Sequence, residues 1–322
     1  LSFLVRSKNI IMKKIAIYLS LFISFLLKSQ SFDVVPLGIY GGEKEDNLSS
    51  YLVSVSGKNQ FLCLDAGTIN SGINKAIENK TFNTDEATVL KDYIKAYFVS
   101  HGHLDHVSGL IINSPADSKK NIYVIPFVKN ILLNQYFTNE VWANFSDEGA
   151  GAIGKYHLNS VEPQKIFEIP KTEFKAQFFE LSHTKTHLSS AILINHQSNY
   201  LLYLGDTGAD RVEQSKKLEN LWENIAPLVK NKSLKAILIE VSFPNSQKEN
   251  LLFGHLTPNL LNEELSKLAQ LVGKEHLKGL NIVITHRKPT GKNPEIIAEE
   301  LRKNNPFQVN LVFPEQGVKL SF

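Results

Sequence analysis

Short apolar runs rich in Val, Ile, Phe and Tyr recur along the whole chain, and they constrain its fold more than any other feature. Most of them are followed by a polar or glycine-containing turn. Runs of this kind are typical of buried β-strands. We therefore expect strands over residues 51–55, 61–64, 96–99, 122–125, 174–181, 191–194, 200–204, 236–239, 282–285 and 309–313.

Helical patterns fall between the later runs. Thr257 can cap a helix that has Pro258 at its first position, where the missing N–H costs nothing, and leucines recur at helical spacing from Leu261 to Leu271. A second helix is expected to begin near Pro294. Early strands with little helix, followed by alternating strands and helices, predict a layered α/β sandwich.

One segment interrupts this rhythm, and we expect an insertion at about 126–172. It contains a helical pattern over 127–137 and a glycine-rich stretch over 149–154. A segment of this kind can form a lid or shape a substrate site, or it can be a surface excursion without such a role. Both alternatives stay open at this point.

The N-terminal 31 residues have the features of a secretory signal peptide. Lys13 and Lys14 precede an apolar run over 15–27, which is shorter than the roughly 20 residues of a transmembrane helix. Small residues then lie before Phe32, where cleavage is expected, and translation is expected to start at Met12. We therefore predict export to the periplasm or the medium, without stable membrane insertion after cleavage. An uncleaved membrane anchor is the alternative.

Charge excludes one class of partner. The chain has 35 basic and 32 acidic residues, but five of the basic residues lie in the first 31 positions, where no acidic residue occurs. The remainder is close to neutral. A protein that follows a nucleic-acid backbone has a clear basic excess, so no nucleic-acid partner is expected.

The densest chemical signal lies directly after the expected strand 96–99. His101, His103, Asp105 and His106 fall within six residues, and extended backbone sends His101 and His103 to the same side. Neutral imidazole and carboxylate are ligands that Zn²⁺ or a similar divalent ion prefers. A metal site is therefore predicted at this strand end.

Three more ligand-type residues follow expected strands at their ends. These are His183, Asp206 and His286, and one sheet edge could bring all three to the same site. His187 lies four residues after His183 and is an alternative ligand or a contact for a substrate phosphate. We favour His183 as the ligand because it lies at the strand end.

The pattern His-x-His-x-Asp-His at 101–106 resembles the signature of the metallo-β-lactamase superfamily. Its continuation to Pro115 resembles one branch, the class II cyclic-nucleotide phosphodiesterases. Further similar segments lie at 203–208, 239–244, 252–258 and 284–289, so the resemblance covers about 32–305. It implies an αββα sandwich for residues 32–322.

The resemblance also implies two divalent ions, Zn²⁺ by default, with Mn²⁺ or Fe as alternatives. The first ion would be held by three imidazoles, those of His101, His103 and His183. The second would be held by Asp105, His106 and His286, with Asp206 bridging the two ions.

By the same resemblance, a hydroxide shared by the two ions, with Asp105 part of the catalytic set, would hydrolyse a 3′,5′-cyclic nucleotide to the nucleoside 5′-monophosphate. Cyclic AMP is the first candidate. Glu240 would orient His255, which would protonate the departing 3′-oxygen. Asp65, which also ends a strand, would orient a metal-bound histidine.

Substrate contacts are expected from two kinds of side chain, polar groups that bind directly and an aromatic ring that stacks on the base. His187 and Thr257 are the candidates for direct binding. The base is expected to stack on an aromatic ring of the 126–172 segment, either Trp142 or Phe145.

Other functions remain possible on this scaffold. The chain could be a nuclease, a lactonase or a β-lactamase, or a non-catalytic metal-dependent nucleotide-binding protein. A redox di-iron protein would usually need a flavin domain, for which the remaining length leaves no room. The segments around Asp206 and His255 favour the phosphodiesterase branch.

Overall fold

The structure, a computed structural model, describes residues 31–184 and 187–322. All of the predicted signal peptide except its last residue lies outside these residues, as does the expected start at Met12. Within the described part of the chain, no helix is both long and apolar enough to cross a membrane.

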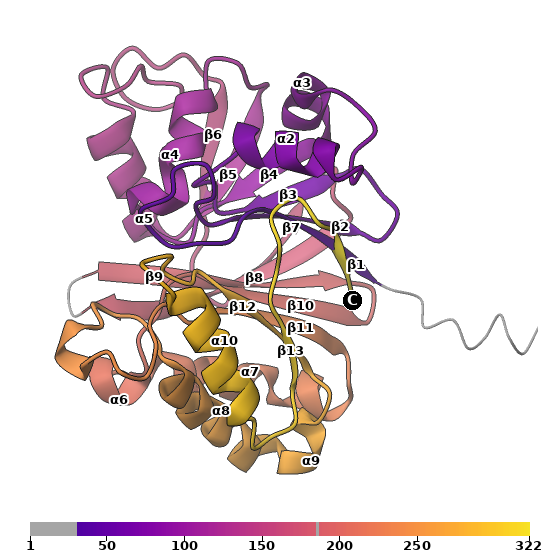
Figure 1. The fold of residues 1–322 in the computed structure, drawn as a ribbon. Coiled ribbons are helices and arrows are strands. Elements are labelled where there is room, and N and C mark those ends of the chain that lie inside the picture. Colours follow the sequence, from indigo (N-terminus) through magenta and orange to yellow (C-terminus); the bar gives the residue numbers. More distant parts are fainter. Residues whose placement is uncertain (1–30, 185–186) are drawn as a thin grey trace, which may run out of the picture. The chain divides into compact units, whose positions relative to one another are not determined.

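Two seven-stranded sheets lie face to face between two layers of helices (Figure 1). In the first sheet the strands are ordered β14 (Leu320–Ser321), β1 (Phe32–Gly38), β2 (Ser50–Val55), β3 (Phe61–Leu64), β4 (Ile94–Phe98), β5 (Lys120–Val124) and β6 (Tyr156–Ser160). In the second the order is β13 (Asn310–Val312), β12 (Asn281–Thr285), β11 (Leu234–Glu240), β10 (Asn199–Leu204), β9 (His187–His196), β8 (Phe174–Thr184) and β7 (Ile166–Ile169).

The longer helices cover the outer faces of the two sheets (Figure 1). Those on the first sheet are α2 (Asn70–Glu78), α4 (Leu104–Asn113) and α5 (Pro126–Ile131). Those on the second are α7 (Lys217–Lys230), α8 (Pro258–Val272) and α10 (Asn293–Lys303). The layers are helix, sheet, sheet and helix, as the resemblance predicted.

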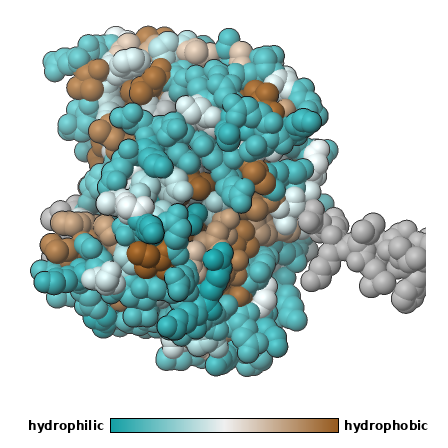
Figure 2. Space-filling model, in the orientation of Figure 1, coloured by the Kyte–Doolittle hydropathy of each residue, from teal (hydrophilic) through white to brown (hydrophobic). Residues whose placement is uncertain are grey.

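Short helical turns complete the secondary structure of the described residues. They are α3 (Glu86–Thr88), η1 (Val89–Tyr93), η2 (Leu132–Tyr136), α6 (Asp210–Glu213), η3 (Glu249–Leu251) and α9 (Lys274–Leu277). The outer surface in Figure 2 is mostly hydrophilic, with hydrophobic residues in separate patches.

Strand direction brings several strand ends to one edge of the second sheet. β8 and β10 are both antiparallel to β9, which lies between them, and β10, β11 and β12 are parallel neighbours. β8, β10, β11 and β12 therefore run in the same direction, and their carboxyl ends share an edge. Residues that follow these four strands are brought together although they are far apart in the sequence.

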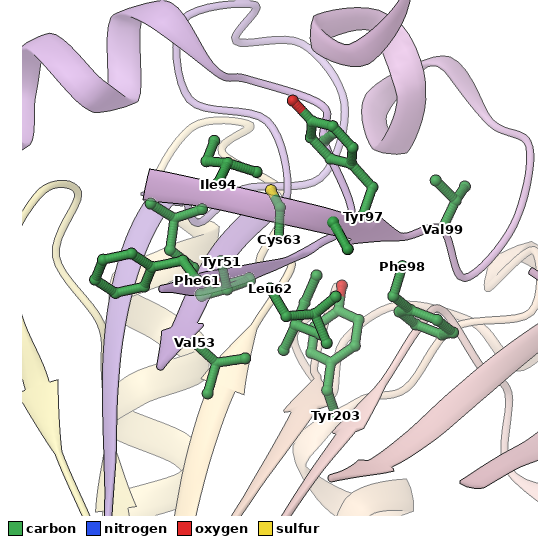
Figure 3. Packing of buried hydrophobic residues seen from close by; sticks show 14 of the residues in the cluster. Tyr51, Val53, Phe61, Leu62, Cys63, Ile94, Tyr97, Phe98, Val99 and Tyr203 are labelled. Carbon is green, nitrogen blue, oxygen red and sulfur yellow. The ribbon is translucent and has the colours of Figure 1, made fainter. Parts of the chain in front are cut away.

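Aromatic side chains fill the space between the two sheets (Figure 3). Tyr203 of β10 reaches across to Phe98 of β4, with the two rings 6.2 Å apart and nearly perpendicular. Leu62 and Tyr51 are also fully buried here. Edge-to-face packing of this kind contributes about 0.5–1.5 kcal/mol beyond the buried area. This contact holds the end of β4 close to the end of β10. The candidate ligands His101 and Asp206 follow these two strands.

The helix predicted after Thr257 is present and begins as expected. Thr257 Oγ1 accepts a hydrogen bond from the backbone N–H of Leu260 at 3.4 Å, and Pro258 is the first helical residue. The helix ends at Val272, just before Gly273. The helix expected near Pro294 is α10.

The segment over 126–172 is more closely integrated than an insertion that lies on the surface. It supplies β6, the edge strand of the first sheet, and β7, the edge strand of the second. We did not predict these two strands, or β1, or helices α2, α4 and α7. β6 (YHLNS) has few apolar residues, and β7 (IFEI) is only four residues long, so hydrophobic patterning alone does not identify either strand.

Candidate metal centre

The histidine-rich motif lies where β4 gives way to α4. His101 follows the strand and is fully buried, whereas His103 is exposed and immediately precedes the helix. Asp105 and His106 belong to the first turn of α4, and the His106 side chain is buried. We expected only a chain turn here, and the helix fixes the directions of these two side chains.

Three imidazoles form the first group of possible ligands. His103 Nδ1 lies 3.1 Å from His101 Nε2 and 3.1 Å from His183 Nε2. Nδ1 of His101 lies 3.0 Å from Ser100 Oγ, and Nδ1 of His183 lies 3.0 Å from the Gly254 carbonyl. Because these partners take the Nδ1 protons, the Nε2 lone pairs of both residues face the shared centre.

The second group contains Asp105, His106 and His286. Asp105 Oδ2 lies 3.1 Å from His286 Nε2. His106 Nδ1 is 2.8 Å from Asp65, and His286 Nδ1 is 2.9 Å from Ser242 Oγ. His106 Nε2 is buried and has no hydrogen-bonding partner among the described residues. An orphaned, buried imidazole nitrogen of this kind is what a metal ion would satisfy.

Asp206 lies between the two groups. Its Oδ2 atom is 3.2 Å from His286 Nε2 and 3.3 Å from His106 Nε2. The same oxygen is 3.7 Å from His101 Nε2 and 3.9 Å from His183 Nε2. Burial alone would raise the pKa of this carboxyl, but the neighbouring imidazoles, His286 first, hold it well below its usual range. A single carboxylate can therefore reach both groups while ionised.

Gly205 lets Asp206 come this close to the histidine motif. A Cβ atom at Gly205 would lie 2.3 Å from the Cβ of Ser100, closer than two carbon atoms can approach. Only glycine therefore allows the end of β10 to pack against the end of β4.

The donor distances fit metal coordination. Two nitrogen ligands at about 2.0–2.1 Å from one ion and at a tetrahedral angle lie roughly 3.3 Å apart. Burial keeps these imidazoles neutral, as ligands must be: it lowers the pKa of His103 to about 4 and of His183 to about 3, and it lowers the pKa of His101 strongly. Neutral lone pairs 3.1 Å apart repel one another unless a cation or a proton lies between them. The residues present therefore fit a centre with divalent ions.

Asp65 holds residues of this centre in place through hydrogen bonds. Its buried carboxylate accepts hydrogen bonds from the N–H and the hydroxyl of Ser100, each at 2.7 Å, and from the hydroxyl of Tyr203. It also accepts the Nδ1 proton of His106. We predicted that Asp65 orients a metal-bound histidine without naming it; Asp65 contacts His106, and Tyr203 links Asp65 to the core between the sheets.

A second hydrogen-bonded set lies beside the metal-type residues. His255 Nδ1 is 2.8 Å from Glu240 Oε1, and both side chains are buried. The Ser242 hydroxyl donates to Glu240 Oε2 at 2.8 Å and accepts the Nδ1 proton of His286. Burial would lower the pKa of His255, but Glu240 and then Asp206 outweigh it, so the pKa is raised. Glu240 thus holds the His255 imidazole in place and favours its charged form.

A cavity of about 310 Å³ opens over these groups. Its walls include Asp105, Asp206 and His255, the rings of Phe243 and Phe253, and Lys288. The lining therefore combines charged or titratable groups with two aromatic rings. We did not single out the two phenylalanines, Ser242 or Lys288 from the sequence, although all four lie in or beside the segments quoted around Glu240, His255 and His286.

The structure separates the two candidate ligands His183 and His187. His183 Nε2 faces His103, whereas the His187 ring stacks on His103 with the centroids 4.4 Å apart. The His187 Nε2 atom is buried without a hydrogen-bonding partner in the described part of the chain. The geometry favours His183 as the third imidazole donor.

Three predicted substrate contacts lie elsewhere. Thr257 is occupied as the cap of α8. Trp142 donates a hydrogen bond to Ser114 beyond the end of α4, and the Phe145 ring packs against Lys155. None of these three described side chains lines the cavity. The stacking of a base on Trp142 or Phe145 stays a prediction, and the aromatic side chains that line this cavity are Phe243 and Phe253.

Comparison with known proteins points to one family. Residues 32–316 match the family of class-II cAMP phosphodiesterases. A protein of Yersinia pestis named as a probable 3′,5′-cyclic-nucleotide phosphodiesterase is 39% identical, over 96% of this chain and 94% of its own length. The 3′,5′-cyclic-nucleotide phosphodiesterase of Aliivibrio fischeri is 40% identical, over 93% and 95%.

Solved structures show the same fold. Unliganded yeast PDE1 matches with a TM-score of 0.81 at 23% identity, covering 91% of this chain and all of the yeast chain. A metallo-β-lactamase fold protein from Bacillus subtilis matches with a TM-score of 0.58 at 16% identity, covering 90% and 99%. The two facing sheets with outer helices are thus the metallo-β-lactamase fold.

Proposed function

This chain belongs to the family of class-II cAMP phosphodiesterases, and we propose that it hydrolyses 3′,5′-cyclic nucleotides to nucleoside 5′-monophosphates. The observation that carries this proposal is the placement of two different sets of groups around one cavity. Four of the seven metal-type donors line the cavity, namely His103, Asp105, His183 and Asp206. His255, which is hydrogen-bonded to Glu240, lines it as well.

Two divalent ions bound by the donors would neutralise phosphate charge and lower the pKa of water from about 15.7 to about 7. His101, His103 and His183 would hold one ion. Asp105, His106 and His286 would hold the other, and Asp206 would reach both. We propose Zn²⁺ as the resident metal because five of these seven donors are imidazoles, with Mn²⁺ and Fe as alternatives for metal analysis to distinguish.

His255 acts as the general acid in this proposal. Water loses one proton as its oxygen bonds to phosphorus, the bond from phosphorus to the 3′-oxygen breaks, and His255 gives its proton to that oxygen. The proton lost by water, exchanged through solvent, restores His255. Glu240 takes Nδ1, so Nε2 is the nitrogen available for proton transfer. Glu240 raises the pKa of His255, which favours the protonated form that a general acid needs.

The test of the reaction is product analysis on the metal-loaded protein. We expect cyclic AMP to give 5′-AMP and no 3′-AMP. Hydrolysis of another ester without any turnover of cyclic nucleotides would overturn the proposal. Binding of cyclic AMP without product would instead support a nucleotide-binding protein.

The test of the general acid uses His255→Ala and two substrates. General acid catalysis contributes typically about 10²–10⁴-fold, so kcat for cyclic AMP should fall by that factor. A 4-nitrophenyl phosphodiester has a leaving group that needs no proton, and its hydrolysis should be much less affected. An equal loss on both substrates, or loss of bound metal, would show that His255 acts as a ligand or a structural residue.

We also propose that the chain is exported, supported by Lys13, Lys14 and the apolar run over 15–27. Protein recovered from the periplasm or the medium should begin at Phe32. Recovery of the intact N-terminus from membranes would support the anchor instead.

A further inference from the structure

Phe253 combines two costly features. Its backbone is left-handed, with φ of +52°, and its side chain is 65% exposed. Left-handed backbone costs a bulky residue energy, and burying its ring in the core could offset that cost. A ring that stays exposed gains little burial energy to offset that cost. Residues held in such conformations cluster at sites where a ligand binds.

The turn that carries Phe253 is fixed against the metal centre. The next residue, Gly254, is also left-handed, and its carbonyl accepts the hydrogen bond from His183 Nδ1 at 3.0 Å. A Cβ atom at Gly254 would lie 1.9 Å from the His183 carbonyl oxygen, so only glycine fits. The position of Phe253 is therefore tied to that of a candidate metal ligand.

Phe253 is one of two phenylalanines that line the cavity. Phe243 lines the same cavity and packs edge-on against His255, with the centroids 5.8 Å apart. Lys288 and Asp105 line the cavity as well. A ligand that is anionic at one end and a flat aromatic at the other would complement both kinds of group in this lining.

We propose that the nucleobase of the substrate stacks on Phe253, an inference that rests on the proposed hydrolysis of cyclic nucleotides. The phosphate would then lie toward the metal-type donors and Lys288. Other exposed apolar side chains, such as Leu251 at 44% exposure, do not line this cavity in the described part of the chain. Phe253 is thus a specificity-determining residue for the base and takes no part in bond breaking.

The expected effect is on binding. Base–aromatic stacking contributes about 1–3 kcal/mol per base, so Phe253→Ala should raise KM for cyclic AMP by about 5- to 140-fold and leave kcat within about 3-fold. Phe253→Tyr keeps the ring and should stay near the wild-type KM. Leu251→Ala, a truncation of comparable exposure two residues away, is the matched control and should change neither parameter.

Two further measurements separate stacking from a structural role. Methyl ribofuranoside 3′,5′-cyclic phosphate has the ring phosphodiester but no base, and its kcat/KM should be the same for Phe253→Ala as for the wild type. The fluorescence of 2-aminopurine riboside 3′,5′-cyclic phosphate should be quenched on binding to the metal-loaded wild type and not to Phe253→Ala.

The results that overturn the inference are distinct from those that overturn the reaction. Equal losses by Phe253→Ala on the substrates with and without a base, or an unchanged KM for cyclic AMP, would exclude stacking on Phe253. Absence of turnover of either substrate by the wild type would refute the reaction. The fluorescence measurement would still decide the role of Phe253, with unquenched wild type counting against it.

Discussion

Replacing Asp65 by Asn tests how the metal centre is held. The carboxylate accepts four hydrogen bonds, from the N–H and hydroxyl of Ser100, the hydroxyl of Tyr203 and Nδ1 of His106. An amide oxygen accepts two, and the amide nitrogen can only donate. At least two buried donors therefore lose their acceptor in Asp65→Asn.

The size of the effect follows from this count. A buried donor left without an acceptor costs about 1–3 kcal/mol, so the free energy of unfolding of the metal-free protein should fall by about 2–6 kcal/mol. His106 also loses the partner that fixes its tautomer. Loss of such a partner typically weakens metal affinity or activity by about 10- to 100-fold. Urea unfolding in chelator and zinc competition titrations measure the two quantities.

Asp117→Asn is the matched control. Asp117 is also buried and accepts from the hydroxyls of Tyr97 and Tyr156, at 2.8 and 2.9 Å, and from Lys120. It contacts none of the candidate ligands, so Asp117→Asn should lose stability and keep its zinc affinity. If Asp65→Asn also keeps wild-type zinc affinity, our account of the support for His106 is wrong.

Three other predictions concern single contacts. Thr257→Ala removes the cap of α8 and should cost about 1 kcal/mol in urea unfolding, with KM unchanged; a raised KM would restore Thr257 as a substrate contact. Burial would raise the pKa of Asp33, but hydrogen bonds from Gly57 and Ser321 help to hold it below its usual range. This carboxylate therefore stabilises the fold above the unfolded pKa of about 3.9, and the gain is lost as pH falls through the lower folded pKa. Asp33→Asn should flatten the loss of stability below about pH 5, and an unchanged acid profile would contradict this. Ser242→Ala removes the acceptor of the His286 Nδ1 proton and should weaken zinc binding by about 10-fold, as the zinc titration would show; wild-type affinity would argue against this role.

The sequence was most informative where a polar residue follows a buried strand. His183 is the next-to-last residue of β8, whereas Asp206 and His286 follow β10 and β12. The shared direction of these strands brings all three to one edge. Residue order and strand ends were therefore enough to predict this grouping. The start of α4 at Leu104 was missed because the motif interrupts any helical pattern of apolar residues.

Contacts that depend on loop conformation could not be predicted in this way. Ser242 matters because one hydroxyl reaches both Glu240, the last residue of β11, and His286, which follows β12. Phe253 reaches the cavity through a left-handed turn that hydrophobic patterning does not encode. Trp142 was a reasonable aromatic candidate by its place in the sequence, but it packs at Ser114.

Metal analysis combined with a hydrolysis assay tests the central claim most directly. The purified chain should contain about two divalent ions per molecule, lose cyclic AMP hydrolysis when a chelator removes them, and recover it when zinc or manganese is added back. A chain that contains no metal, and that stays inactive after zinc and manganese are supplied, would contradict the account.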